Sequence, residues 1–360
     1  MSGAVVSREG PAVFDRRSIS GRDASSFPRV LVTGAGGQAG LSAMTALCDE
    51  EIDLFSADAD PHALGLHLVD ESRRLRIPEG GWGAYTEWLY ELCEGHRIDV
   101  LIPAAGRELV LLASARGLFA EVGTKIVLPS EETLRICLDR WALHQRCDGA
   151  VRVPRSLLAD EDFDPSDLEL PVIVRPRMRG GSCRARLIEQ RKELERIDRG
   201  ASLLVQEHLP GPEYSLVTFA TSDSQVTAVI PLAQSKVDAG GGCAVSDETL
   251  KAVGRRVAKR IGLTSVATIH LKETSDGELA LFGVKAHFPE MIPPMAVSGV
   301  NLPMLCVEDA LGSPPKVTRW PLGQSDSGSS ARLPRRGSPL ASPWASVGRG
   351  SPTRSPGRPG

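Results

Sequence analysis

The sequence predicts an α/β protein in which a parallel sheet precedes a set of antiparallel strands. Between residues 29 and 128, short apolar segments alternate with amphipathic helical segments, a pattern typical of a parallel sheet with helices on both faces. A glycine-rich turn joins the first strand to the first helix. Later apolar segments pair around short turns, which favours antiparallel strands.

The elements of the first part follow from their hydrophobic patterns. Between the first two strands, Leu41, Met44 and Leu47 lie on one face of an expected helix. The expected strands are short and apolar, and they lie at Arg29–Val32, Leu54–Ala57, Val100–Ile102 and Lys125–Leu128.

A second series of elements begins at Ser130, whose hydroxyl can cap the N-terminus of a helix. Leu134, Leu138 and Trp141 give this helix one apolar stripe. The remaining expected elements are strands at 172–175, 203–207, 214–220 and 226–232, a helix at 247–261, and a hairpin that joins 266–272 to 279–287.

Composition and charge exclude several classes of protein. The formal net charge of -3 argues against a nucleic-acid-binding protein. Seven cysteines without a C-x-x-C pair argue against a disulfide framework or a structural zinc site. The chain has neither a signal peptide pattern nor a run of about 20 apolar residues that would span a membrane. We therefore expect a cytoplasmic protein that binds neither nucleic acid nor a membrane.

Composition also divides the chain into zones. Residues 1–28 are polar and interrupted by Gly, Pro and Arg, which predicts a flexible leader. Residues 29–312 carry the apolar patterns of folded structure. From Ser313 onward Pro, Gly, Ser and Arg dominate, and such a segment buries too little apolar surface to offset its ordering entropy. Residues 313–360 are therefore expected to be disordered.

The turn at Thr33–Gly40 reads T-G-x-x-G-x-x-G and leaves two interpretations open. Its glycines permit either a simple tight turn or the approach of a phosphate to backbone N–H groups. Asp58 follows the second strand, where a ribose-binding acid lies in dinucleotide-binding proteins, so an NAD(P)-dependent oxidoreductase is one hypothesis. Short-chain dehydrogenases use Tyr-x-x-x-Lys, in which the lysine lowers the pKa of the tyrosine. None of the three tyrosines, Tyr85, Tyr90 and Tyr214, has a lysine four residues later.

Three motifs follow one another in the second part of the chain. The first, Cys137-Leu138-Asp139-Arg140-Trp141, places a basic residue on a helix. The second, Pro171–Pro176, places Arg175 on an apolar strand, and an arginine- and glycine-rich segment follows it. The third, Leu204–Tyr214, runs from a strand end through Pro210-Gly211-Pro212 to Glu213.

The order of these motifs resembles the ATP-grasp superfamily, in particular stand-alone relatives of the carbamoyl-phosphate synthase large subunit. The resemblance covers residues 29–312 and implies a Rossmann-like N-terminal domain at 29–130 followed by an ATP-grasp domain at 131–312. This second domain would have a small lid part, 131–205, and a larger antiparallel-sheet part, 206–312. In this family the glycine loop usually carries no dinucleotide, and the ligand implied is ATP.

The resemblance also implies roles for individual residues at an adenine nucleotide. Arg140 and Arg175 would contact its phosphates, and Glu213 would accept hydrogen bonds from its ribose. The phosphate lid would consist of Arg177, Arg179, Gly180, Gly181 and Ser182. Backbone groups would read the edge of the adenine, and they belong to Gln206, Glu207, His208 and Leu209.

The expected metal-binding strand departs from the family pattern. Relatives carry Glu-x-Asn on this strand and an amide or acid on the preceding one, whereas this chain has Gly283, Lys285 and His270 at those positions. Without carboxylates we expect no hard-cation site, so a role for Mg²⁺ is in doubt. Lys285 would partly replace the ion, or it would point to solvent beside an inactive site. His270 and His287 could form a soft-metal pair, but two histidines without a third ligand are more often ordinary polar residues.

Three functions are consistent with these patterns. The preferred hypothesis is an ATP-binding protein that has lost its metal ligands and serves as a regulatory or partner subunit, with another protein or with its own copies. The second is an active carboxylate-amine ligase that works through an acyl phosphate. The third is the oxidoreductase. The sequence does not identify a catalytic base.

Overall fold

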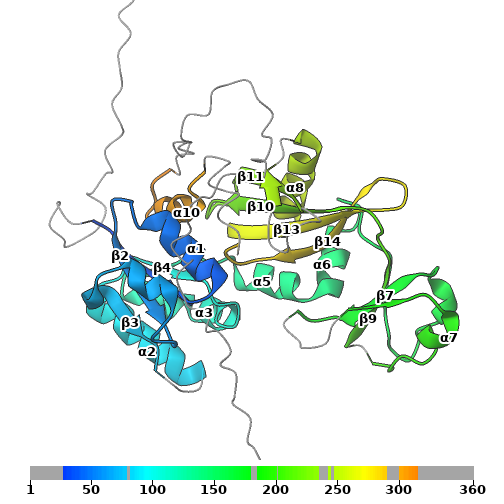
Figure 1. Cartoon of the computed structure of the whole chain (residues 1–360), viewed down its shortest axis with the longest axis horizontal. Helices are drawn as coiled ribbons and strands as arrows, with labels where there is room; N and C mark the ends of the chain where they lie inside the picture. Colours follow the sequence, from blue (N-terminus) through cyan, green and yellow to red (C-terminus); the bar gives the residue numbers. More distant parts are fainter. Residues whose placement is uncertain are drawn as a thin grey trace, which may run out of the picture. The chain divides into compact units, whose positions relative to one another are not determined.

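Three β-sheets organise the part of the chain that the computed structural model describes (Figure 1). The described residues are 27–78, 82–179, 185–200, 202–234, 242–244, 247–289 and 300–314. The expected leader, apart from residues 27–28, and the expected tail beyond residue 314 lie outside these ranges. Gly180, Gly181 and Ser182 of the expected phosphate lid also lie outside them.

The first sheet is parallel throughout and has the strand order β3-β2-β1-β4-β5. Its side chains alternate between two faces, so that Leu31 belongs to one apolar core while Val30 and Val32 belong to another. Its strands are β1 (Arg29–Thr33), β2 (Asp53–Asp58), β3 (Arg74–Arg76), β4 (Val100–Pro103) and β5 (Lys125–Ile126).

Helices bury both faces of this sheet, as the alternation of strands and helices predicted. Met44 of α1 lies in the core of Val30, and Leu89 of α2 lies in the core of Leu31. The helical segments of this part are α1 (Gln38–Leu47), η2 (Leu64–Leu68), η3 (Glu71–Arg73), α2 (Trp82–His96), α3 (Leu109–Ser114) and α4 (Arg116–Glu121). The predicted α/β class, with a parallel sheet first and antiparallel sheets after it, is confirmed.

The second sheet, called here the small sheet, is antiparallel with the order β6-β9-β7-β8. Val172, Val174 and Val205 face its own apolar core, and the alternation of side chains places Arg175 and Gln206 on the opposite face. Strand β9 spans Leu203–Glu207, the range predicted for it from the sequence. The elements are β6 (Ser156–Leu158), η4 (Pro165–Asp167), β7 (Val172–Pro176), β8 (Arg186–Ile188), α7 (Arg191–Leu194) and β9 (Leu203–Glu207).

The third sheet, called here the large sheet, is antiparallel with the order β12-β11-β10-β13-β14. One face packs Leu216, Ile269 and Val284 into the same apolar core as Val253 and Val257 of α8. The other face carries the polar positions discussed below. The elements are β10 (Glu213–Ala220), β11 (Val226–Gln234), β12 (Gly242–Ala244), α8 (Glu248–Arg260), β13 (Ser265–Glu273), β14 (Leu279–Lys285) and α10 (Leu302–Ala310).

The helix expected from Ser130 through Trp141 is divided in two. Ser130 caps α5 (Glu131–Leu138) as predicted, because its hydroxyl accepts a hydrogen bond from the Thr133 N–H. At Asp139 the backbone becomes extended, and the Asp139 carboxylate accepts hydrogen bonds from the N–H groups of Trp141 and Ala142. A second helix, α6 (Arg140–Cys147), therefore begins here. The expectation of a single helix was wrong. An apolar stripe does not reveal that an aspartate within it ends one helix and caps the next.

The turn between β1 and α1 needs glycine for reasons of packing. Gly34 has a φ of 63°, which favours glycine, and its carbonyl group lies against α1 at Gly40. A Cβ atom added at Gly40 would lie 2.1 Å from the Gly34 carbonyl oxygen. These contacts explain two glycines of the T-G-x-x-G-x-x-G pattern without any bound phosphate.

Replacing Gly40 with alanine should lower the free energy of unfolding by about 1–3 kcal/mol, because the added methyl group would meet backbone atoms that cannot move independently. Gly95→Ala in α2 is the matched control, since Gly95 is exposed and has no atom within 4 Å of an added Cβ. This control should be neutral or stabilising, by about 0.5–1 kcal/mol. Denaturant unfolding measures both variants, and equal stabilities would contradict the packing argument.

Candidate functional site

Arg140, Arg175 and Arg179 form a group, called here the arginine cluster, where the small sheet contacts β14 of the large sheet. The Arg175 guanidinium lies 4.6 Å from the ring centroid of Phe282 in β14. The Arg179 guanidinium lies beside Gly283 of the same strand. The charges of Arg140 and Arg179 lower the pKa of Arg175, and the charge of Arg179 lowers the pKa of Arg140, so the three cations share one electrostatic environment.

Arg175 lies on the face of the small sheet opposite its apolar core, and it is buried, with 6% of its surface exposed. Its Nη1 atom donates a hydrogen bond to Oε1 of Gln206 at 3.1 Å. Gln206 in turn donates from Nε2 to the Ser156 hydroxyl at 3.2 Å. Burial lowers the pKa of Arg175 to about 9, and repulsion by Arg140 and Arg179 contributes.

Arg140 is the first residue of α6, a position set by the Asp139 cap. Its Nη1 atom donates to the carbonyl oxygens of Pro176 at 2.7 Å and Met178 at 3.1 Å. Burial lowers the pKa of Arg140 to about 10, and the charge of Arg179 adds to the effect. The helix start therefore anchors the segment that leaves β7.

The Asp139 carboxylate, which precedes Arg140, does not neutralise the arginine cluster. Asp139 is paired with Arg177, whose Nε and Nη2 atoms donate to its carboxylate at 2.7–3.0 Å. Although burial opposes the shift, hydrogen bonds from Arg177 and from backbone N–H groups lower the pKa of Asp139. Arg177, expected in the phosphate lid, thus has a carboxylate partner of its own.

Five polar nitrogen atoms at this site are buried and lack a hydrogen-bond partner among the described residues. They account for most of the eight such side-chain atoms in that part of the chain. They are Nε of Arg140, Nε of Arg175, Nε of Arg179, Nε2 of His144 and Nε2 of His270. Buried donors without partners are costly, and so are buried cations without counter-charges. Such a group is suited to bind a polyanion.

His144 belongs to this site, although the motifs did not single it out. It lies one helical turn after Arg140, so the two side chains share a face of α6. Its Nδ1 atom lies 3.2 Å from the Ser156 hydroxyl and 3.5 Å from Nε2 of Gln206. Burial, with the charges of Arg175, Arg179 and Arg140, lowers the pKa of His144 to about 4. The i, i+4 spacing from Arg140 was the available sequence signal.

The residues expected around the adenine and the ribose lie close together along the chain. Gln206 and Glu207 end β9, and Glu207 accepts two hydrogen bonds from Nη2 of Arg152, at 2.8 and 2.9 Å. His208 is half-buried, and Leu209 is buried. Glu213 begins β10.

The polar face of the large sheet brings Glu213, His270 and Gly283 together. Nδ1 of His270 lies 3.6 Å from Oε1 of Glu213 and 3.2 Å from the Ser215 hydroxyl. The interaction between Glu213 and His270 lowers the pKa of the Glu213 carboxyl group, which is therefore ionised at neutral pH. Burial lowers the pKa of His270 itself. Gly283 lies opposite His270, and Lys285 follows on the same face of β14.

A magnesium ion does not fit the side chains on this face. Within the described residues, no group of three or more His, Cys, Asp or Glu side chains could hold a metal. Glu213 is the acid that interacts with His270, while Lys285 and Arg179 bring positive charges near that histidine. Mg²⁺ needs several oxygen ligands in near-octahedral geometry.

In the glycine turn of the parallel sheet, the N–H groups of Ala35, Gly36 and Gly37 have acceptors within the protein. Gly36 N–H donates to the Asp58 carboxylate at 2.6 Å, and the N–H groups of Ala35 and Gly37 donate to backbone carbonyls. Asp58 therefore holds the turn itself. Tyr85 donates to the buried carboxyl group of Glu108, whose pKa is raised by burial, so this tyrosine belongs to a buried network.

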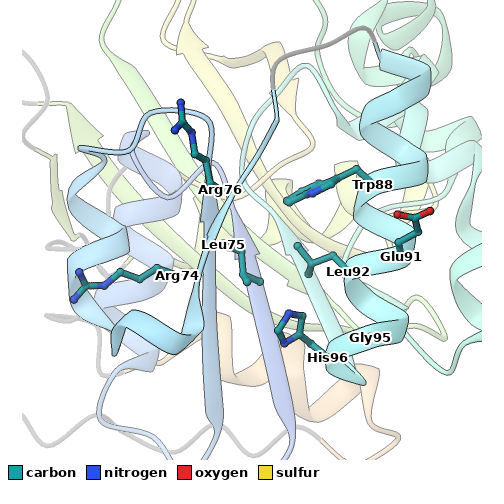
Figure 2. Close-up of a pocket in the computed structure, with 8 residues that line it drawn as sticks. All are labelled: Arg74, Leu75, Arg76, Trp88, Glu91, Leu92, Gly95 and His96. Atoms are coloured by element: carbon teal, nitrogen blue, oxygen red, sulfur yellow. The ribbon is translucent and has the colours of Figure 1, made fainter.

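A separate surface pocket of about 400 Å³ lies between β3 and α2 (Figure 2). Figure 2 shows Trp88 and Leu92 of α2 directed toward Leu75, whereas the guanidinium groups of Arg74 and Arg76 point away from it. The pocket contains none of the residues singled out in the sequence.

Comparison with protein families assigns both parts of the chain. Residues 199–325 match the family described as ATP-grasp in the biosynthetic pathway with Ter operon. This chain contains an ATP-grasp domain. Residues 30–127, which form the parallel sheet, match the PylC-like N-terminal domain. No curated protein matches the sequence.

Solved structures with the ATP-grasp fold resemble the chain at low identity. A biotin carboxylase-beta-gamma-ATP complex from Campylobacter jejuni is 16% identical, with 80% of this chain and 71% of that chain covered and a TM-score of 0.64. N5-carboxyaminoimidazole ribonucleotide synthetase from Thermotoga maritima is 17% identical, with 81% and 77% covered and a TM-score of 0.59. The biotin carboxylase domain of a thermophilic 2-oxoglutarate carboxylase, bound to ADP without magnesium and with a disordered phosphate tail, is 15% identical, with 81% and 72% covered and a TM-score of 0.58. At these identities the likeness establishes the fold.

None of the helices among the described residues is long and apolar enough to cross a membrane.

The buried His144 predicts a stability that depends on pH. Because its pKa is about 4 in the folded protein and 6.5 ordinarily, only the unfolded state takes up a proton between these values. The free energy of unfolding should therefore fall as the pH drops from 6.5 toward 4. His144→Gln should flatten this decline by up to about 1.4 kcal/mol per pH unit. Denaturant titrations of both proteins across this window test the assignment, and parallel curves would contradict it.

Proposed function

We propose that the arginine cluster of this ATP-grasp domain binds the phosphates of an adenine nucleotide. The observation that carries the proposal is the set of five buried nitrogen atoms that have no partner among the described residues. Three of them are arginine donors, and a triphosphate supplies several acceptor oxygens and a high negative charge, so one ligand would satisfy these donors and neutralise the cations. Arg140 and Arg175 are the proposed phosphate contacts, in agreement with the family resemblance.

The adenosine part of the ligand would lie along the segment from β9 to β10. Backbone groups of Gln206, Glu207, His208 and Leu209 would read the adenine edge, and the apolar Leu209 side chain supports this placement. Glu213 would accept hydrogen bonds from the ribose, which its ionised carboxylate can do at neutral pH.

We further propose that the chain acts in the cytoplasm as a regulatory or partner subunit, related to stand-alone relatives of the carbamoyl-phosphate synthase large subunit. The reason is the polar face of the large sheet, where Gly283 and Lys285 stand at expected ligand positions and Mg²⁺ does not fit. Phosphoryl transfer depends on a cation that bridges the phosphates in a fixed geometry. The arginines can bind the nucleotide, whereas rapid transfer of its phosphate would also require that bridging cation.

An active carboxylate-amine ligase is the second candidate, and the structural neighbours favour it. They include an L-amino acid ligase from Bacillus licheniformis and the carboxyaminoimidazole ribonucleotide synthetase. The fold would then perform the same class of reaction on a substrate set by its variable loops.

Arg175→Ala should weaken ATP binding by about 10- to 100-fold, because a hydrogen bond to a charged group contributes about 1.5–3 kcal/mol. Calorimetry with ATP, ADP and AMP should show that the loss decreases as phosphates are removed. Arg135→Ala is the matched control, since Arg135 is exposed and paired with Glu131 on α5. It should bind as tightly as the wild type. Absence of wild-type binding at millimolar ATP, together with NADH binding, would refute the proposal.

Phosphate release separates the partner subunit from the ligase. Purified protein with ATP, Mg²⁺ and mixtures of candidate carboxylates and amines should release phosphate at no more than the background rate. Glu213→Ala provides the reference, because it removes the proposed ribose acceptor and should abolish any turnover that comes from this site. Release at ordinary ligase rates, lost in Glu213→Ala, would replace the partner role with catalysis.

A further inference from the structure

The Arg179 guanidinium occupies the space in which a side chain at position 283 would begin. A Cβ atom built on Gly283 would lie 1.8 Å from Nη2 of Arg179 and 3.0 Å from its Cζ atom. No side chain at position 283 is compatible with this placement of the guanidinium. The glycine on β14 and the arginine that follows β7 therefore form one structural unit.

The backbone around Arg179 directs its side chain to this place. Its N–H donates to the carbonyl oxygen of Leu138 at 2.8 Å, and the preceding residue, Met178, forms a bridge with Asp139. The segment after β7 is thereby fastened to the junction of α5 and α6. With its backbone held there, the long side chain of Arg179 extends to β14.

The place that the guanidinium reaches is the polar face of the large sheet. Gly283 lies opposite His270 across the β13–β14 pair, and the register of this pair shifts next to His270, so that Phe282 has no partner on β13. Lys285 follows on the same face as Gly283, which is the face where the family resemblance expects metal ligands. This face therefore carries the acid Glu213 together with positive charge from Lys285 and Arg179.

We propose that Arg179, seated on Gly283, supplies the positive charge that a divalent cation would provide, so that nucleotide binding by this chain is independent of metal. The proposal rests on the nucleotide binding proposed above. The observation that carries it is the close approach of the Arg179 guanidinium to Gly283, together with an Arg179 Nε atom that is buried and has no hydrogen-bond partner among the described residues.

The chemistry of guanidinium explains both what this arrangement does and what it lacks. Arg179 has a planar fork of five N–H donors that matches two oxygens of a phosphate chain, and it remains charged at neutral pH. A carboxylate at position 283 would have attracted a cation, whereas glycine leaves that space to the arginine. Guanidinium does not hold phosphates in the octahedral geometry of Mg²⁺, so this site favours binding over transfer.

The test measures ATP affinity by calorimetry in EDTA and in excess Mg²⁺. The wild type should bind with the same affinity, within about twofold, in both solutions. Arg179→Ala should weaken ATP binding by about 10-fold or more in EDTA, with a small effect on AMP. Gly283→Ala retains every charge but displaces the guanidinium, so it should reproduce the loss.

Lys285→Ala serves as the rival variant, because Lys285 is the other cation on this face. A smaller loss in Lys285→Ala than in Arg179→Ala supports the assignment, and the reverse order overturns it. Thermal melting of each variant identifies those that fail to fold, and Arg179→Lys then tests the guanidinium in a conservative form.

Two further outcomes separate the proposals. If the wild type binds ATP at least about tenfold more tightly with Mg²⁺ than with EDTA, the metal-independent role of Arg179 is wrong while the nucleotide site stands. If the wild type binds ATP in neither solution, both proposals are wrong.

Discussion

The crowding of three guanidinium groups, of which Arg175 is buried and Arg140 and Arg179 are partly buried, is the constraint on which the rest of the site depends. Arg140, Arg175 and Arg179 repel one another, and burial makes each charge costly. The fold reduces this cost with partners that have no charge. Arg140 donates to two backbone carbonyls, while Arg175 donates to Gln206 and lies over the ring of Phe282.

Asp139 organises the cluster without neutralising it. Its carboxylate caps α6, which places Arg140, and it binds Arg177, which fixes the segment that follows β7. Because these interactions occupy the carboxylate, Asp139 does not neutralise the positive charges of Arg140, Arg175 and Arg179. A single residue at a helix junction thus sets the positions of cations that come from different elements.

The two halves of the chain use their polar groups in opposite ways. In the parallel sheet, Asp58 accepts from Gly36 N–H, and Glu108 binds Thr33 and Tyr85, so these polar groups satisfy one another. At the arginine cluster, the Nε donors of three arginines have no partner in the part of the chain that the structure describes. This contrast is the physical reason for placing the nucleotide at the ATP-grasp domain and not at the glycine turn, although the glycine pattern is the more familiar signal.

The sequence by itself determined the fold class and the positions of the longer strands, because side-chain periodicity and local motifs act over a few residues. Thus β9 has the bounds predicted for it, Leu203–Glu207, and Ser130 caps α5 as its position predicted. Only the tertiary structure decided that Asp139 divides a helix, that His144 joins the arginines, and that Arg179 lies on Gly283. Arg179 and Gly283 are more than a hundred positions apart, and their contact depends on how two sheets meet. No local pattern records that geometry.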